Sequence, residues 1–200
     1  MTTNGYAWRI TGLRASALIL VPLFFIVSPV WGFANLAHEA IEVVGILILL
    51  VGVLGRFWAI LYVGSKKATE IVTDGPYSLT RNPLYLFSTI ATFGIGLMFG
   101  AVFYAVLLAG TIGTILYLTA RREEAWLAER FGAPYAAYAR EVPFFLPRLT
   151  GYRSETRVTF DVPSLTRNLR DALVFLAFIP LVEVFDWLKL ALPAAPFRVW

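Results

Sequence analysis

The sequence predicts an all-α membrane protein, a polytopic bundle of about five transmembrane helices with a further helical motif on its cytoplasmic side. Of its 200 residues, 58% are hydrophobic and only 15% are charged, whereas soluble domains are about 45–50% apolar and about 25% charged. The mean hydropathy is +0.71. The apolar residues gather in long runs that polar, basic segments separate. A chain of this length and composition is expected to form one membrane domain over residues 1–200.

The apolar runs are candidate spans, because a helix needs roughly 20 apolar residues to cross the hydrocarbon core. The third and fourth runs have almost no linker between them, which predicts a tight helical hairpin whose close approach Gly96 and Gly100 permit. The last run carries Pro180, Glu183 and Asp186, so it either spans the membrane or lies partly in the interface. The predicted spans are 13–33, 41–63, 84–99, 101–119 and a last helix at 171–193.

The basic residues predict the orientation of the chain. If five spans alternate, 14 of the 17 lysines and arginines fall on one side of the membrane. Basic loops stay in the cytoplasm, so the N-terminus and the two long loops are expected to be cytoplasmic, in the inner membrane of a bacterium or archaeon. The polar segment 150–170 is expected to be a cytoplasmic linker or a surface-lying segment before the last helix.

Composition also excludes several kinds of chemistry. The chain has no cysteine, which excludes disulfides, iron–sulfur clusters and thiol nucleophiles. The single histidine, His38, cannot form a zinc site alone, and no metal site is predicted. The glycines at 94, 96 and 100 lie inside an apolar run with no strand before them, so they are not a dinucleotide-binding fingerprint. The pI near 9.5 is explained by basic cytoplasmic loops rather than by nucleic-acid binding.

The stretch GPYSLTRNPLY, residues 75–85, stands directly before the third apolar run. Its Gly-Pro pair turns the chain, and Pro83 suits the first turn of the following helix. The start of a helix carries free backbone N–H groups and a positive dipole end, so it can receive an anionic group. Arg81 adds a planar fork that is suited to a carboxylate.

Two tyrosines, Tyr77 and Tyr85, flank Arg81 in this stretch. Aromatic faces attract cations such as a sulfonium or an ammonium. The plainer interpretation is a positive-inside anchor with an aromatic belt at the membrane interface. For Arg81 alone the two interpretations are equally good, and the whole cluster favours a binding site.

The second informative stretch is RREEAWLAERFGAPYAAYAREVPFFLPRL, residues 121–149. The fourth span is expected to continue into it as a helix. Gly132 fits the C-cap of that helix, and Pro134 starts a second, short helix. Tyr135 and Tyr138 are three residues apart and share one face of the short helix, where they either wall a pocket or anchor the interface.

Two adjacent acids, Glu123 and Glu124, lie on the first of these helices. Glu124 shares a face with Tyr117 and Arg121 through i, i+4, i+7 spacing, and Glu123 lies on the neighbouring face. A carboxylate close to Arg81 can bind a ribose, an amino group or a proton. The spacing alone favours a plainer interpretation, an exposed helix with local ion pairs of about 0.2–0.5 kcal/mol each.

Arg56 is the unexpected residue of the second span. A charge at the bilayer centre costs about 2.5–3.5 kcal/mol on insertion scales. Arg56 is therefore expected to face the bundle, a cavity or an acidic partner, with snorkelling to the membrane surface as the alternative.

Taken together, GPYSLTRNPLY and REEAWLAERFGAPYAAYAREVPFFLPRL resemble the core of the isoprenylcysteine carboxyl methyltransferase and phospholipid methyltransferase superfamily, here residues 52–149. The family pattern is roughly GPY-x-x-x-RHP-x-Y, a helical hairpin, and then paired acids and tyrosines. The resemblance implies a membrane enzyme that uses S-adenosylmethionine at the cytoplasmic face and a lipophilic acceptor from the bilayer. It implies catalytic roles for Arg81 and Glu124, and cofactor-binding roles for Tyr77, Asn82, Pro83, Tyr85, Glu123, Glu124, Tyr135 and Tyr138.

One position departs from the family pattern, because its histidine is Asn82 here. An amide forms hydrogen bonds but cannot titrate. A carboxylate acceptor is already ionised near neutral pH and needs no base, whereas an amine must lose a proton. The departure therefore favours carboxyl O-methylation of an isoprenylcysteine-like acceptor over phospholipid N-methylation.

Two further hypotheses remain. Membrane reductases of the sterol type, which use NADPH, have a similar core, and a non-enzymatic membrane scaffold could retain the same fold. The expected partners are a lipophilic or lipidated substrate and membrane lipids, without nucleic acid, and no oligomeric state is predicted.

Overall fold

The computed structural model describes residues 3–30, 35–64, 69–191 and 197–199. Almost all of this chain is helical, which confirms the all-α prediction. Two three-residue strands, β1 (Val27–Pro29) and β2 (Phe197–Val199), pair in parallel. The helices are α1 (Thr3–Ile26), α2 (Leu36–Val63), the 3-10 helix η1 (Gly75–Ser78), α3 (Pro83–Met98), α4 (Val102–Phe131), α5 (Ala133–Glu141), α6 (Val162–Leu176) and α7 (Phe178–Ala191).

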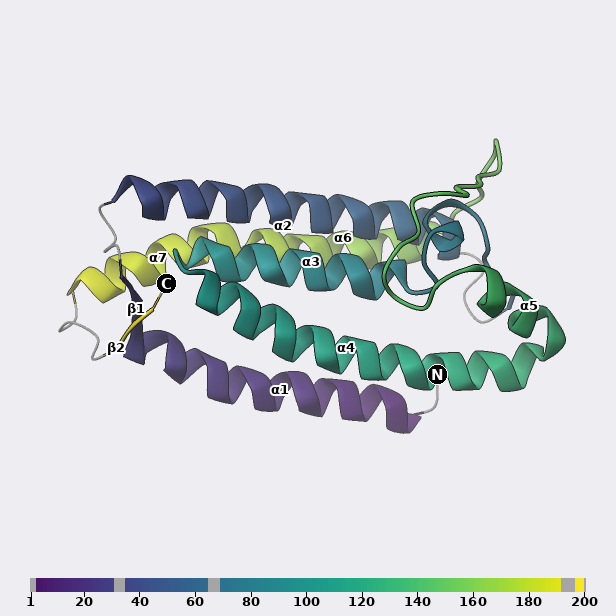
Figure 1. Cartoon of the computed structure of the whole chain (residues 1–200), viewed down its shortest axis with the longest axis horizontal. Coiled ribbons are helices and arrows are strands. Elements are labelled where there is room, and N and C mark those ends of the chain that lie inside the picture. Colours follow the sequence, from purple (N-terminus) through teal and green to yellow (C-terminus); the bar gives the residue numbers. More distant parts are fainter. Residues whose placement is uncertain (1–2, 31–34, 65–68, 192–196, 200) are drawn as a thin grey trace.

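The long helices lie side by side along one axis (Figure 1). Helices α6 and α7 follow one another in a row next to α2 and α3, and α5 gathers with the irregular segments at one end of the bundle. We call this the motif end. Helix α1 begins towards the motif end and α7 finishes at the opposite end, so the chain passes along the bundle five times. This arrangement places the two chemically rich loops together, as the sequence predicts.

Within the described ranges, two helices are long and apolar enough to cross a membrane by length and composition, α2 and α4. Helix α3 and the segment Ile10–Leu20 of α1 are shorter apolar helices. Helices α6 and α7 have 15 and 14 residues, fewer than the roughly 20 that a single span needs. The structure therefore confirms a helical bundle of membrane type, and the number of five spans stays a prediction.

The outer surface of α2 carries large apolar side chains that no part of the bundle covers. Soluble monomers rarely expose contiguous apolar patches of this kind, and a helix that crosses a bilayer presents such a surface to lipid. The exposed residues on α2 include Val43, Val44, Leu47, Leu50, Val51 and Leu54.

Several helix boundaries differ from the predicted ones, and the single last helix predicted at 171–193 was wrong, because two helices, α6 and α7, occupy this region. Helix α1 ends at Ile26, and residues 31–34 of the first predicted span lie outside the described residues. Helix α6 begins at Val162, so the irregular segment is shorter than the predicted linker 150–170. The Asp161 carboxylate caps α6 by accepting a 2.9 Å hydrogen bond from the Ser164 backbone N–H. Hydropathy missed this start because the first turns of α6 are amphipathic.

Glycines bring α2 and α3 into backbone contact. A Cβ atom on Gly52 would lie 2.5 Å from the backbone nitrogen of Ala91, and one on Gly94 would lie 2.5 Å from that of Leu49. A side chain at either position would force the helices apart, so the glycines allow the two backbones to lie in direct contact. This contact fixes the position of α3, whose first turn follows the GPYSLTRNPLY stretch.

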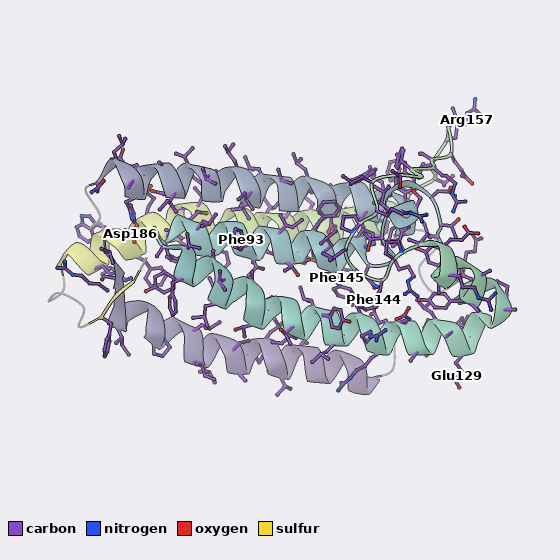
Figure 2. The ribbon with its side chains drawn as sticks, viewed as in Figure 1. Phe93, Glu129, Phe144, Phe145, Arg157 and Asp186 are labelled. Atoms are coloured by element: carbon purple, nitrogen blue, oxygen red, sulfur yellow. The ribbon has the colours of Figure 1, made fainter. Side chains whose placement is uncertain are left out.

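The predicted hairpin of α3 and α4 is present. Gly96 packs against the backbone of Ala105, as expected for a close helix–helix contact. The expectation for Gly100 was wrong, because it lies in the connection between the helices with φ +74 and not in their contact. Its missing side chain leaves room for the His38 ring, whose Nε2 lies 3.2 Å from the Asp186 carboxylate. Asp186 thus has a packing role at the far end of the bundle (Figure 2).

Candidate functional site

Residues 75–82, which we call the motif loop, lie beside residues 142–148, which we call the cap segment. Hydrogen bonds of 2.9–3.0 Å join the two along their length. They bring together stretches that are more than sixty residues apart in the chain. The bonds run from Thr80 Oγ1 to Phe145 O, from Arg81 N to Pro143 O, from Asn82 Nδ2 to Phe144 O and from Arg148 N to Leu79 O.

The turn that starts the motif loop requires glycine. Gly75 has φ +60, a conformation that side-chain-bearing residues rarely adopt, and the Tyr62 ring packs where its Cβ would be. Its backbone N–H donates a 2.7 Å hydrogen bond to the Arg153 carbonyl oxygen. The Ser78 hydroxyl donates to the Gly75 carbonyl oxygen at 2.6 Å and accepts from the Arg153 N–H at 3.1 Å. The chain after the cap segment therefore holds this turn in place.

An ion pair between Arg81 and Glu124 lies where the motif loop meets α4. The two side chains are only 11% and 15% exposed. Glu124 also lies 3.4 Å from Arg121, whose side chain is 57% exposed. The Phe144 ring of the cap segment packs against both arginines, with its centroid 5.6 Å from Arg81 Cζ and 4.9 Å from Arg121 Cζ. The Glu124 carboxylate and the Phe144 ring thus each contact both arginines, of which Arg81 is buried and Arg121 is exposed.

Two tyrosines on α5 turn their rings into the same region. Tyr135 and Tyr138 are buried, with ring centroids 6.0 Å apart. The Tyr138 hydroxyl donates a 2.8 Å hydrogen bond to the Tyr77 carbonyl oxygen. Burial raises the pKa of Tyr135 to about 12, and the nearby Glu124 carboxylate adds to the rise. Tyr135 is therefore a neutral hydroxyl at pH 7, within hydrogen-bonding reach of Arg81 and Glu124.

Tyr77 lies inside the motif end. Burial raises the pKa of its hydroxyl well above the ordinary value, and the charges or hydroxyls of Tyr138, Glu123 and Tyr85 raise it further. The positive charge of Arg56 acts in the opposite direction and lowers this pKa. The Tyr77 ring is therefore part of the buried interior of the motif end.

Asn82 and Pro83 form the start of α3. Pro83 is fully buried in the first turn. Asn82 occupies the N-cap position without a side-chain capping bond. Its amide instead donates to the Phe144 carbonyl oxygen. At the position of the family histidine, this chain therefore has a structural hydrogen-bond donor.

All the residues that the sequence predicts for the site lie at the motif end, and their roles stay predictions. The sequence did not single out Phe144 for a contact with arginine. It did place Arg121 on the same helix face as Glu124. The signal for Phe144 was a pair of prolines within the cap segment, Pro143 and Pro147, which keep the chain extended and able to pair with the motif loop. Figure 2 shows Phe144 and Phe145 at this end, between the motif loop and α4.

A cleft of about 310 Å³ opens beside the motif loop. Arg81 and Glu124 do not line it. The Phe144 ring of the cap segment lies against Arg81 instead. The Nε atom of Arg81 is buried and has no hydrogen-bond partner among the residues that the structure describes. The residues that line the cleft are Ser78, Glu141, Val142, Arg148, Gly151, Tyr152 and Arg153.

A family model described as phospholipid methyltransferase matches residues 40–134. The cobalt-zinc-cadmium resistance protein CzcN of Cupriavidus metallidurans is 37% identical over 142 residues, which are 71% of this chain and 65% of that protein. The nickel-cobalt-cadmium resistance protein NccN of Alcaligenes xylosoxydans xylosoxydans is 36% identical over 147 residues, 74% of this chain and 68% of that protein. This chain belongs to the phospholipid methyltransferase family. No solved structure matches it.

The family is part of the isoprenylcysteine carboxyl methyltransferase and phospholipid methyltransferase superfamily, so the resemblance read from the motifs is confirmed. The part of the chain that matches the phospholipid methyltransferase model contains the motif loop and both members of the Arg81–Glu124 pair. It stops before Tyr135 and the cap segment. The match to CzcN spans slightly less than two thirds of that relative's length. Within the described residues, no group of three or more His, Cys, Asp or Glu side chains is placed to hold a metal ion.

Proposed function

We propose that this chain is an integral membrane methyltransferase that uses S-adenosylmethionine to methylate a lipophilic acceptor at the motif end. The observation that supports it most is the buried ion pair of Arg81 and Glu124, with Tyr135 beside it, at one end of an apolar bundle. Buried charges are costly unless they are paired. Their presence in a small, mostly apolar protein of this family therefore favours a binding role.

The site carries the kinds of donor, acceptor and aromatic group that the cofactor requires. When bound, S-adenosylmethionine supplies a methyl group on a positively charged sulfur. The unpartnered Nε of Arg81 is a donor suited to a carboxylate, and Glu124 can accept from an amino group or a ribose hydroxyl. The Tyr135 hydroxyl stays a neutral donor at pH 7. The rings of Phe144 and Tyr77 exclude water and attract positive charge.

We propose a carboxylate as the methyl acceptor, on a lipid or a lipidated molecule of the isoprenylcysteine kind. The Asn82 side-chain amide donates a hydrogen bond to the Phe144 carbonyl oxygen, so this residue holds the cap segment in place. A carboxylate is ionised near neutral pH and needs no base. The acceptor enters from the bilayer, because the motif end adjoins helices with exposed apolar surfaces. The cytoplasmic location of this end rests on its basic loops.

Isothermal titration of the purified full chain in detergent tests cofactor binding. We expect S-adenosylmethionine and its demethylated product to bind, and Arg81→Ala or Glu124→Ala to weaken binding by at least ~1 kcal/mol, the low end for a charge-assisted hydrogen bond. Glu129→Ala and Arg140→Ala are matched controls with exposed side chains. Figure 2 shows Glu129 pointing outward from α4, away from Phe144. These controls should bind as the unaltered chain does.

The outcome of the titration separates the competing hypotheses. Tight binding of NADPH with no response to S-adenosylmethionine would favour a membrane reductase. Absence of binding to either molecule would favour a scaffold. Equal losses in Glu124→Ala and Glu129→Ala would show that the Arg81–Glu124 pair is not part of the binding site.

Incubation with a lipid extract and methyl-labelled S-adenosylmethionine tests the acceptor. A carboxyl methyl ester releases its label as methanol in mild base, whereas a methyl group on nitrogen stays attached. We expect base-labile label in the lipid fraction. Base-stable label would instead support phospholipid N-methylation.

We also propose a role in resistance to heavy metals, because both relatives are named as metal resistance proteins. Growth of a deletion strain in cobalt, zinc, cadmium and nickel salts tests it. Rescue by the unaltered gene and not by Glu124→Ala would connect resistance to the site. Equal rescue by both would separate resistance from methyl transfer.

A further inference from the structure

A second polar cluster lies inside the bundle, between α2, α3 and α6. Arg56 donates one hydrogen bond to the Ser88 hydroxyl. Its Nη2 donates to Asn168 Oδ1 at 3.3 Å and to Asp171 Oδ2 at 3.1 Å. The Phe175 ring lies against the guanidinium, with its centroid 5.4 Å from Arg56 Cζ. The sequence left three possibilities for Arg56, the bundle, a cavity or an acidic partner, and the structure shows that it faces the bundle with Asp171 as an acidic partner.

Asn168 has an unused donor in this cluster. The residue is only 4% exposed. Its Nδ2 is buried and has no hydrogen-bond partner in the part of the chain that the structure describes. Buried polar atoms are almost always hydrogen-bonded. The Oδ1 of the same amide accepts from Arg56, so the side chain lies in this cluster, and its Nδ2 requires a further acceptor.

The acidic partner of Arg56 is weakly held. The Asp171 side chain is 55% exposed, whereas that of Arg56 is 15% exposed. Ion pairs with an exposed partner contribute little to stability, so Asp171 can be displaced by another anion. Arg56 itself cannot be left without an anion at low cost, because it projects from an apolar helix. The cluster is thus suited to exchange one oxyanion for another.

The surroundings of the cluster favour a lipid as the source of that oxyanion. Leu169 and Leu173 lie on the same helix as Asn168 and are 48% and 57% exposed. They are four residues apart and therefore share one face of α6. A phosphate or carboxylate headgroup at Arg56 would place its acyl chains next to these apolar residues. A small soluble anion would gain nothing from them.

We propose that Arg56, which Ser88 positions, and Asn168 form a binding site for the oxyanion headgroup of a membrane lipid, which takes the place of the Asp171 carboxylate. A planar guanidinium binds two oxygens of such a group, and Asn168 Nδ2 donates to a third. This lipid-binding proposal is independent of the proposed methyl transfer, because none of its residues belongs to the site around Arg81.

Native mass spectrometry of the full chain in detergent tests this proposal with three probes. Phosphatidylglycerol carries both the phosphate and the acyl chains, diacylglycerol carries only the chains, and inorganic phosphate carries only the oxyanion. We expect one phosphatidylglycerol molecule to bind saturably and the other two to leave no adduct at the same concentration. Equal binding of diacylglycerol would show that the acyl chains alone carry the affinity. Equal binding of inorganic phosphate would point to a free-anion site. Either result overturns the proposal.

Substitutions in the cluster are expected to change the affinity for phosphatidylglycerol in opposite directions. Arg56→Gln and Asn168→Leu should weaken phosphatidylglycerol binding at least fivefold. Asp171→Asn should tighten it, because it removes the carboxylate that competes for Arg56. The matched control is Arg170→Gln, which removes an exposed arginine next to Asp171 and should change nothing.

Asp171→Asn keeps the proposal testable if the other cluster variants fail to fold, because it alters only an exposed side chain. Unchanged or weaker binding in Asp171→Asn would show that the cluster serves only to hold α6 against the bundle. A loss in Arg170→Gln equal to that in Arg56→Gln would show nonspecific attraction to a basic surface. Both results contradict the proposal.

Discussion

The Tyr138 hydroxyl donates a 2.8 Å hydrogen bond to the Tyr77 carbonyl oxygen, and this bond ties α5 to the turn before α3. Both residues are buried. We predict that Tyr138→Phe destabilises the chain, because it leaves a buried carbonyl without its partner, at a cost of about 1–3 kcal/mol. Chemical unfolding in detergent, followed by circular dichroism, measures the loss.

Tyr152→Phe is the control for this substitution. Its side chain is exposed, and its ring contact with Trp58 does not need the hydroxyl. The control should change the free energy of unfolding by less than about 0.5 kcal/mol. Similar losses in the two variants would contradict the role assigned to the Tyr138–Tyr77 bond.

The Arg81–Glu124 pair should behave as a coupled unit. Removing Glu124 leaves the buried Arg81 charge without its carboxylate, and removing Arg81 leaves Glu124 only the exposed Arg121. Breaking a buried pair costs about 3–5 kcal/mol. We predict that Arg81→Gln and Glu124→Gln each destabilise strongly, and that the double variant loses much less than the sum of the two. Arg121→Gln, which alters the exposed neighbour of the same carboxylate, should cost less than about 1 kcal/mol. A double-mutant cycle on unfolding free energies tests this, and additive losses would speak against a buried pair.

Replacing each of two glycines by alanine should change the stability of the chain in opposite directions. Gly52→Ala places a methyl group 2.5 Å from the Ala91 backbone nitrogen, so α2 and α3 must separate, and we predict a loss of stability. A Cβ on Gly110 in α4 meets no atom within 4 Å. Gly110→Ala should therefore stabilise α4 by up to about 1 kcal/mol through helix propensity. Thermal unfolding in detergent distinguishes the two, and a stabilising Gly52→Ala would contradict the close packing of α2 on α3.

The raised pKa of Tyr135 predicts a loss of stability at high pH. In the unfolded chain this hydroxyl ionises near pH 10, whereas in the folded chain burial holds its pKa at about 12. The stability that comes from the neutral, buried hydroxyl is fully present below about pH 10 and is lost as the pH rises through about 12.

Unfolding free energies measured at intervals from about pH 8 to about pH 12 test this dependence. Tyr135→Phe should lose less stability across this range than the unaltered chain does, because its ring cannot ionise. Burial raises the pKa of Tyr138 too, so part of the dependence remains. A Tyr135→Phe profile that matches that of the exposed-site control Tyr152→Phe would contradict the prediction.

The sequence by itself determined the class of the protein and the position of its motifs. Hydropathy and helix signals placed α2, α3 and α4 within a few residues. They also predicted the C-cap at Gly132 and the short helix that follows it. These features follow from local rules, because capping, turn formation and helix periodicity each depend on residues only a few positions apart. The motif order likewise sufficed to recognise the superfamily.

Only the tertiary structure decided which partners the polar side chains have. Spacing along α4 offered Arg121 as the natural partner of Glu124, but the buried partner is Arg81, from 43 positions away. The amide of Asn82 is used by the cap segment, and Arg56 meets α6 at Asp171, 115 positions further on. These contacts depend on how glycines let α2 and α3 approach and on where the chain returns after α5. No local pattern of residues carries that information, because it arises only when whole helices pack.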